Sequence, residues 1–171
     1  ACFLWAYALT GYAGFLERTK NAMRMTMEAY PHWKWTNGLT QEMARMLLPL
    51  AFLLRLEDTP EHRGWLERIA TDLLAQMQPT GAIYELLGQI EDGSYPSPRS
   101  NAEYGTTEAS LIQENGDPAC DLLYTTNYAF LGLHEAASAT GDATLREAED
   151  RLAGFLYRIQ VRSKAQPYLD G

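Results

Sequence analysis

Cysteine is scarce in this sequence of 171 residues, which contains Cys2 and Cys120 and no others. The two stand in unrelated contexts, so they predict neither a disulfide framework nor a zinc cluster. Long apolar runs are also absent: the longest, such as residues 46–54, are about half of the roughly 18 residues that a membrane span needs. We therefore expect no transmembrane helix, no bound metal and no other cofactor.

Basic residues are few, with 14 Lys and Arg against 22 Asp and Glu, and the formal net charge is −8. A nucleic-acid backbone or an anionic membrane would require a basic surface, so neither is expected as a partner. Hydrophobic residues make up 46% of the chain, which is ample for a core and excludes disorder. Together these features favour one soluble domain, either cytoplasmic or periplasmic or secreted.

One supersecondary pattern occurs three times along the chain, at about residues 2–30, 39–78 and 121–162. Each copy contains an apolar stretch, a tight turn and an amphipathic stretch with helical period. In the third copy, for example, Leu145, Leu152 and Ile159 recur among charged residues at helical spacing. We therefore predict three helical hairpins.

The signals for helix starts agree with this assignment. Thr59 stands before Pro60, which suits the first position of a helix, and Asp142 stands where the last amphipathic stretch would be capped. These residues predict where the second helices of two hairpins begin.

The first stretch of each hairpin is nearly free of charge. Residues 43–56 contain Arg45 and Arg55 as their only charged side chains, and residues 122–133 contain none. A helix that is apolar on all sides is buried on all sides, so these stretches predict an inner layer of helices covered by an outer, amphipathic layer. We favour an all-α ring of hairpins, an α/α toroid; an ordinary helical bundle or a solenoid is the alternative.

Two long connections lead from an outer helix to the next inner helix, at residues 31–39 and 79–120. In a ring of hairpins both fall on the rim where the inner helices begin. Long ordered loops often carry function, and the positive ends of the helix dipoles point to the same rim. We therefore expect the functional site there.

Acidic and aromatic residues are concentrated in these connections, and Arg99 is the single basic residue of 79–120. Aromatic rings stack on the apolar faces of sugars, carboxylates accept hydrogen bonds from hydroxyl groups, and two carboxylates can act as acid and base at a glycosidic bond. Four acids are the catalytic candidates: Glu85, Glu114, Asp117 and Asp121. Five aromatic residues are the candidates for substrate binding: Trp33, Trp35, Tyr84, Tyr104 and Tyr124.

Each candidate also has a simpler interpretation. Asp121 precedes the third inner helix and suits the role of its N-terminal cap. Glu114 and Asp117 flank Asn115 and Gly116, so ordinary turn chemistry can account for both. The aromatic residues can be part of the packing of the loops, and Cys120 can be a buried, inert thiol.

The alternation of buried and amphipathic helices, with residues 6–11, 66–68 and 132–136, resembles the six-hairpin glycosidase superfamily, the (α/α)6 toroids. The resemblance covers nearly the whole chain and implies a carbohydrate-active enzyme, usually a glycoside hydrolase acting on an oligosaccharide or small sugar. About three of the six hairpins are present here. The resemblance therefore implies that the remainder of the same polypeptide completes the ring and the pocket.

Two other functions stay open. A sugar isomerase or epimerase on a similar toroid would use histidines for proton transfer, and of the three histidines only His32 lies near the predicted rim. A non-catalytic protein, either glycan-binding or a helical-repeat interaction module, is the second alternative.

Overall fold

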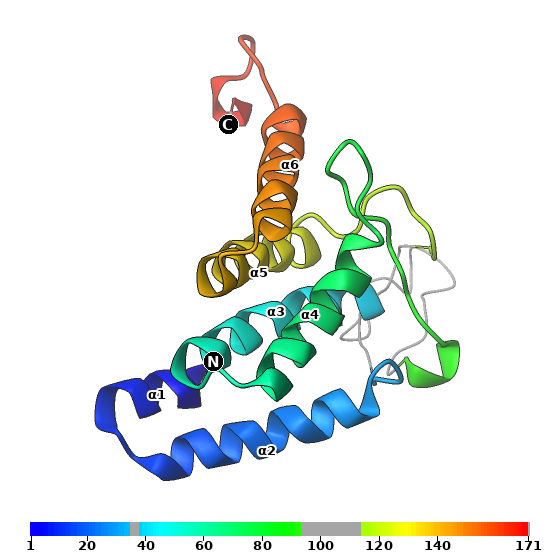
Figure 1. The fold of residues 1–171 in the computed structure, drawn as a ribbon. Helices are drawn as coiled ribbons and strands as arrows, with labels where there is room; N and C mark the ends of the chain where they lie inside the picture. Colours follow the sequence, from blue (N-terminus) through cyan, green and yellow to red (C-terminus); the bar gives the residue numbers. More distant parts are fainter. Residues whose placement is uncertain (35–37, 94–113, 171) are drawn as a thin grey trace.

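The computed structural model describes residues 1–34, 38–93 and 114–170, and these residues form an all-helical protein with no β-strand (Figure 1). The α-helices are α1 (Cys2–Thr10), α2 (Ala13–Ala29), α3 (Leu39–Leu56), α4 (Pro60–Leu74), α5 (Thr125–Thr140) and α6 (Ala143–Ile159). Two short 3-10 helices, Ile90–Asp92 and Pro167–Leu169, complete the described part. The predicted all-α class is confirmed.

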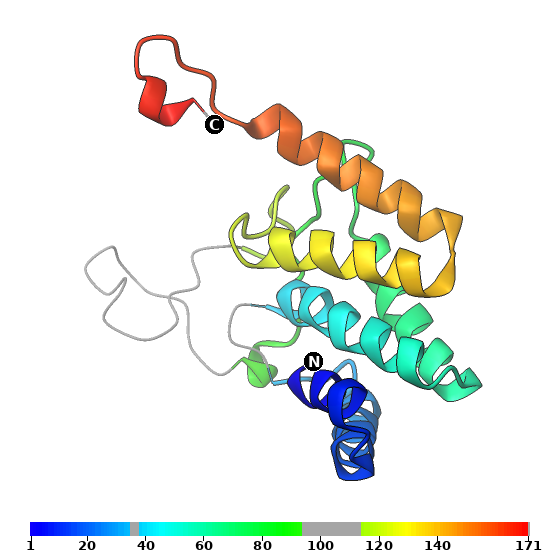
Figure 2. The ribbon, with the colours of Figure 1, turned by 90° about the vertical axis from the view of Figure 1, so that its left-hand side faces the viewer.

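Successive helices pack against one another as α1 with α2, α3 with α4, and α5 with α6. Helix α3 is the centre of the molecule, because it also packs against α1 and, most extensively, against α5. In Figure 2 α3 and α5 lie side by side and begin at the same end of the molecule. The connections that precede these two helices are therefore brought to one end.

The interface between α3 and α5 holds the best-buried part of the core. Leu47 and Leu50 of α3 and Leu133 of α5 are completely buried. Gly132 lets the two helices approach closely, since a Cβ atom at this position would lie 2.7 Å from the Cβ atom of Leu47. The predicted burial is confirmed for most of residues 43–56 in α3. In residues 122–133 it holds for one face of α5 only, because Leu123, Tyr128 and Leu131 are exposed.

Helix α1 differs from the expectation that it is buried. Leu4 is its one fully buried residue, whereas Phe3, Trp5 and Leu9 are exposed, Leu9 by 79%. The apolar composition of a helix predicts that it needs partners, but it does not say which segments supply them. Among the described residues α1 packs against α2 and, to a lesser extent, α3. The burial expected for the first helix in a complete ring is therefore not found among the described residues.

The predicted helix caps are confirmed. The Thr59 hydroxyl accepts a hydrogen bond from the His62 amide at the start of α4, where Pro60 occupies the first turn. The Asp142 carboxylate accepts one from the Thr144 amide at 2.7 Å and so caps α6. These side chains satisfy amides that have no partner within their own helix.

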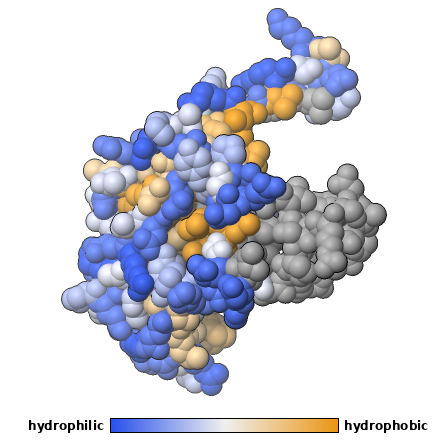
Figure 3. Space-filling model, turned by 90° about the vertical axis from the view of Figure 1, so that its right-hand side faces the viewer, coloured by the Kyte–Doolittle hydropathy of each residue, from blue (hydrophilic) through white to orange (hydrophobic). Residues whose placement is uncertain are grey.

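Hydrophilic residues cover much of the face shown in Figure 3, and apolar surface gathers below the C-terminal segment that follows α6, residues 160–170. Ile159 and Val161 are among the exposed large apolar side chains. In the part of the chain that the structure describes, no helix is both long and apolar enough to cross a membrane.

Candidate functional site

Residues 83–87 run along the beginning of α3 and bind its first amides. Leu39 and Thr40 donate backbone hydrogen bonds to the carbonyl oxygens of Leu87 and Leu86, at 3.1 and 2.9 Å. The Thr40 hydroxyl in turn accepts a hydrogen bond from the Leu86 amide at 2.7 Å. The N-terminal amides of a helix have no hydrogen-bond partners within the helix, and here the carbonyl oxygens of residues 86 and 87 are their partners. These bonds also fix the position of the extended segment on α3.

The other edge of the same segment binds the chain that leads into α5. The Glu85 amide donates to the Asp117 carbonyl oxygen at 3.0 Å, and the Gly116 amide donates to the Glu85 carbonyl oxygen at 2.6 Å. The Cys120 amide donates to the Ile83 carbonyl oxygen at 2.8 Å. The starts of α3 and α5 and the residues before α5 therefore meet around Glu85.

The Glu85 side chain is 1% exposed, and its pKa is raised from 4.5 to about 7. Burial is the main cause; the backbone of Asp121 and the Thr40 hydroxyl lower the pKa, while the negative charges of Asp121 and Asp117 raise it further. Neither carboxyl oxygen of Glu85 forms a hydrogen bond of normal geometry with the described residues. The Thr40 hydroxyl and the Asp121 backbone therefore affect the Glu85 carboxyl as nearby dipoles. A carboxyl that titrates near neutrality can hold and release a proton.

Two of the three other predicted acids, Asp117 and Asp121, lie close to Glu85, and both bind backbone amides. Asp121 accepts hydrogen bonds from the amides of Tyr124 and Thr125, at 2.5 and 3.3 Å, and so caps the start of α5. Asp117 accepts one from the Glu114 amide at 2.8 Å, within the predicted turn. Glu114 itself is exposed.

The predicted aromatic residues are divided between the surface and the core. Tyr84 and Tyr124 are exposed beside the segments around Glu85. Trp33 is buried. Its indole N–H donates to the Thr26 carbonyl oxygen at 2.5 Å, and the centroid of its ring lies 4.7 Å from the centroid of the Tyr30 ring. Trp35 and Tyr104 lie outside the described residues.

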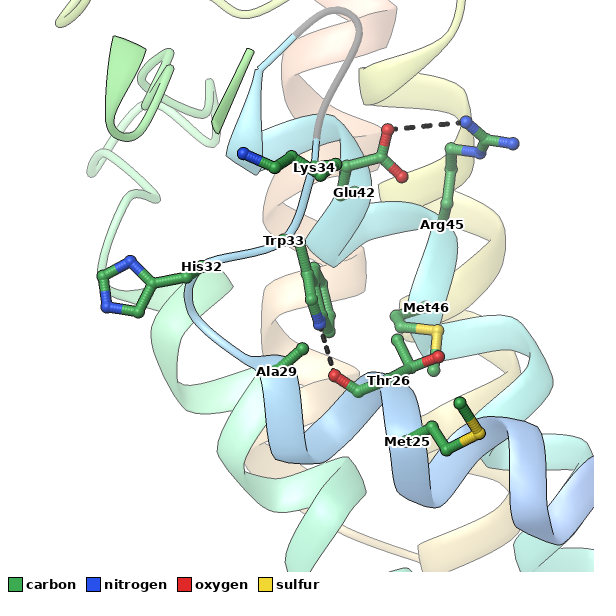
Figure 4. Close-up of a pocket in the computed structure, with 9 residues that line it drawn as sticks. All are labelled: Met25, Thr26, Ala29, His32, Trp33, Lys34, Glu42, Arg45 and Met46. Carbon is green, nitrogen blue, oxygen red and sulfur yellow. Dashed lines mark hydrogen bonds and ion pairs between the residues drawn. The ribbon is translucent and has the colours of Figure 1, made fainter. Parts of the chain in front are cut away.

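An open cleft of about 540 Å³ lies between the end of α2 and the first half of α3 (Figure 4). Its lining residues are Met25, Thr26, Ala29, His32, Trp33, Lys34, Glu42, Arg45 and Met46. Lys34 and His32 both lie near the Asp92 carboxylate, with N···O distances of 3.2 and 3.4 Å. Charged groups at this cleft are therefore already paired in part.

A smaller cavity of about 170 Å³ lies on the other side of α3, towards α5. It is lined by Gln41 and Arg45 from the first turns of α3, and by Tyr124 and Tyr128 from the start of α5. Of these four residues, the sequence had indicated only Tyr124. Arg45 was recognisable as one of two charges in an apolar helix, but its position relative to Tyr128 depends on how α3 and α5 pack.

The described residues contain no group of three or more His, Cys, Asp and Glu side chains that could hold a metal ion. Cys120 is buried, with its sulfur 3.5 Å from the Thr126 hydroxyl oxygen. Burial raises the pKa of its thiol to about 12, so the thiol is protonated at neutral pH and is a poor nucleophile.

Comparisons with protein-family models, with curated proteins and with solved structures found no match for this chain.

Proposed function

We propose that this protein is a carbohydrate-active enzyme, a glycoside hydrolase whose site lies where α3 and α5 begin. The observation that carries the proposal is the buried Glu85 carboxyl, with a pKa of about 7, among the acids that precede α5. Cleavage of a glycosidic bond needs a carboxylic acid that is still protonated near neutrality, and burial is the usual way to obtain one.

In this proposal Glu85 donates its proton to the oxygen of the scissile bond. Its two oxygens form no hydrogen bond with the described residues, which leaves them for a ligand hydroxyl or a water molecule. Because the side chain is 1% exposed, a substrate can reach it only if the rim opens.

The second carboxylate comes from Glu114, Asp117 or Asp121, or from elsewhere in the polypeptide. Its oxygens would lie about 5–5.5 Å from those of the acid for a retaining mechanism and about 6.5–9.5 Å for an inverting one.

The proposed architecture is an (α/α)6 toroid to which the described helices contribute three hairpins. The pairing of successive helices around a central, deeply buried α3 supports it. The exposed face of α1 supports it too, because Leu4, Trp5 and Phe52 line an apolar groove there. In the proposed ring the remainder of the same polypeptide covers this groove.

A glycan-binding protein without turnover is the second candidate. It is favoured by the use of the Asp121 and Asp117 carboxylates as hydrogen-bond acceptors for backbone amides, which is a structural role. Binding and turnover must therefore be measured separately.

The test is to incubate the full-length protein with a panel of oligosaccharides at pH 5 to 8 and to measure the release of reducing ends. Glu85→Gln should lower turnover at least about a hundredfold, the scale of general acid catalysis, and leave sugar binding intact. Glu147→Gln, an exposed acid on α6, is the matched control and should keep the parent rate.

Turnover at the parent rate in Glu85→Gln would overturn the assignment of the acid. Binding of oligosaccharides without turnover in the parent protein would establish the second candidate. Absence of both binding and turnover over the whole panel would contradict a carbohydrate function.

A further inference from the structure

Thr40, in the first turn of α3, contacts the residues on both sides of Glu85. Its hydroxyl oxygen accepts a hydrogen bond from the Leu86 amide at 2.7 Å, and its own amide donates to the Leu86 carbonyl oxygen at 2.9 Å. The same hydroxyl lies 3.4 Å from the Tyr84 carbonyl oxygen and 3.3 Å from that of Leu86. Thr40 is completely buried, so its side chain helps to fix where residues 84–86 lie on α3.

The Glu85 carboxyl group lies at the same start of α3. A Cβ atom placed on Gly38, two residues before Thr40, would lie 3.1 Å from Glu85 Oε1. Both carboxyl oxygens are buried and have no hydrogen-bond partner among the described residues. Because these oxygens are closed to solvent in this arrangement, the donors that stabilise the carboxylate after Glu85 loses its proton must come from the protein.

Three backbone amides around Glu85 already have acceptors. The Glu85 amide donates to Asp117, the Gly116 amide donates to Glu85, and the Leu86 amide donates to the Thr40 hydroxyl. The Thr40 hydroxyl proton differs, because the two carbonyl oxygens that could accept it lie at 3.3 and 3.4 Å. A normal O–H···O bond spans roughly 2.5–3.0 Å, so this proton is weakly held and can turn to a better acceptor.

We propose that Thr40 is a positioning residue for Glu85, and that its hydroxyl turns from the backbone carbonyl oxygens to the carboxylate when Glu85 loses its proton. Its part in catalysis rests on the proposed glycoside hydrolase function, in which Glu85 gives its proton to the oxygen of the scissile bond and is left as the carboxylate. Thr40 keeps its own proton throughout. A hydrogen bond to an ionised acceptor is stronger than one to a neutral carbonyl oxygen, so the hydroxyl prefers the carboxylate once it forms.

The surroundings of Glu85 otherwise disfavour its ionised form. Burial raises the pKa of Glu85 most, and the negative charges of Asp121 and Asp117 raise it further. The Cys120 thiol lies nearby too, but its own pKa of about 12 leaves it protonated at neutral pH. The Asp121 backbone and the Thr40 hydroxyl lower the pKa of Glu85. Of these two groups, the Thr40 hydroxyl is the one that a substitution can remove.

The experiment follows the ionisation of Glu85 itself, by ¹³C NMR of the glutamate carboxyl groups of the full-length protein from about pH 4 to 10, with Glu85→Gln to identify the signal. Thr40→Val keeps the shape of the side chain and removes the hydroxyl. It should raise the midpoint of the Glu85 titration by about 1–2 pH units, the size expected for a hydrogen bond to a charged group. Thr40→Ser keeps the hydroxyl and should restore the parental midpoint.

Thr19→Val is the matched control, because Thr19 is a buried threonine of α2 whose hydroxyl donates to the Phe15 carbonyl oxygen at 2.8 Å. It should leave the Glu85 midpoint unchanged.

A merely structural role for Thr40 would give a different result. Thr40→Val would then lower the free energy of unfolding without moving the Glu85 midpoint, which would overturn the proposal. A midpoint as high in Thr40→Ser as in Thr40→Val would overturn it too. If Thr40→Val does not fold, the parent protein decides. Its Thr40 hydroxyl proton, protected from exchange by burial, should move downfield with the Glu85 midpoint, and a signal that keeps its position would overturn the proposal.

Turnover tests the catalytic part separately. If Glu85 is the acid in the cleavage of a glycosidic bond, the alkaline limb of the pH–rate profile should move upwards in Thr40→Val by the same amount as the NMR midpoint. A shifted midpoint in a protein that cleaves no oligosaccharide would support the link between Thr40 and Glu85 and contradict the assignment of an enzyme. Cleavage that depends on Glu85, with an unchanged midpoint in Thr40→Val, would overturn the role of Thr40 and leave the enzyme assignment standing.

Discussion

Glu85 owes its environment to residues that are distant from it in the sequence. The backbone of Glu85 is hydrogen-bonded to Asp117 and Gly116, and the next residue, Leu86, is hydrogen-bonded to Thr40 at the start of α3. The sequence singled out Glu85 because it follows an apolar pair just past an amphipathic stretch. Its burial could not be predicted, since burial depends on how residues 83–87 lie on α3.

The raised pKa of Glu85 predicts how stability depends on pH. The pKa is 4.5 for an exposed carboxyl and about 7 in the folded protein, so between these values the folded state holds a proton that the unfolded state has lost. The free energy of unfolding therefore falls as pH rises from about 4.5 to 7. A difference of this size corresponds to about 3 kcal/mol.

Glu85→Gln removes the ionisable group and resembles its protonated form. The variant should match the parent near pH 4 and be more stable near pH 8 by up to about 3 kcal/mol, as measured by chemical denaturation across this range. Glu147→Gln should leave the pH profile unchanged. Parallel profiles for the parent and Glu85→Gln would mean that the carboxyl is not buried in solution.

At the scale of the helices, α3 and α5 were predictable because they are nearly free of charge, and their companions α4 and α6 because they are amphipathic and begin at recognisable caps. Helix α1 has the same apolar composition, yet most of its large side chains are exposed. Apolar composition predicts that a helix is buried, but which segments cover it depends on the tertiary structure. The start of α5 was placed too early, because Asp121 caps the helix from a position before it.

The close approach of α3 and α5 predicts opposite effects for two glycine substitutions. Gly132→Ala places a Cβ atom 2.7 Å from the Cβ atom of Leu47 and 3.2 Å from the Ala44 carbonyl oxygen, so it should destabilise the protein by about 1–3 kcal/mol. Gly64→Ala meets no atom within 4 Å in α4 and should stabilise it by about 0.5–1 kcal/mol. Denaturant titration measures both. Equal effects of the two substitutions would contradict the packing of α3 on α5.

In the molecule as a whole, the described parts of the two long connections meet where α3 and α5 begin. The sequence predicted that acids and aromatic residues would gather there, and the structure places Glu85, Asp117 and Asp121 close together along bonded chain segments. It also adds Gln41 and Arg45, which no pattern in the sequence connected with Tyr124. Their common cavity depends on the relative positions of two helices far apart in the chain.

The central claim is that the end of the molecule where α3 and α5 begin binds carbohydrate. The most direct measurement is a crystal structure of the full-length protein soaked with mixed mono- and oligosaccharides. The account predicts a sugar bound where α3 and α5 begin, beside the chain segments that surround Glu85. A sugar bound only elsewhere, for example in the apolar groove of α1, or no bound sugar at saturating concentration, would contradict it.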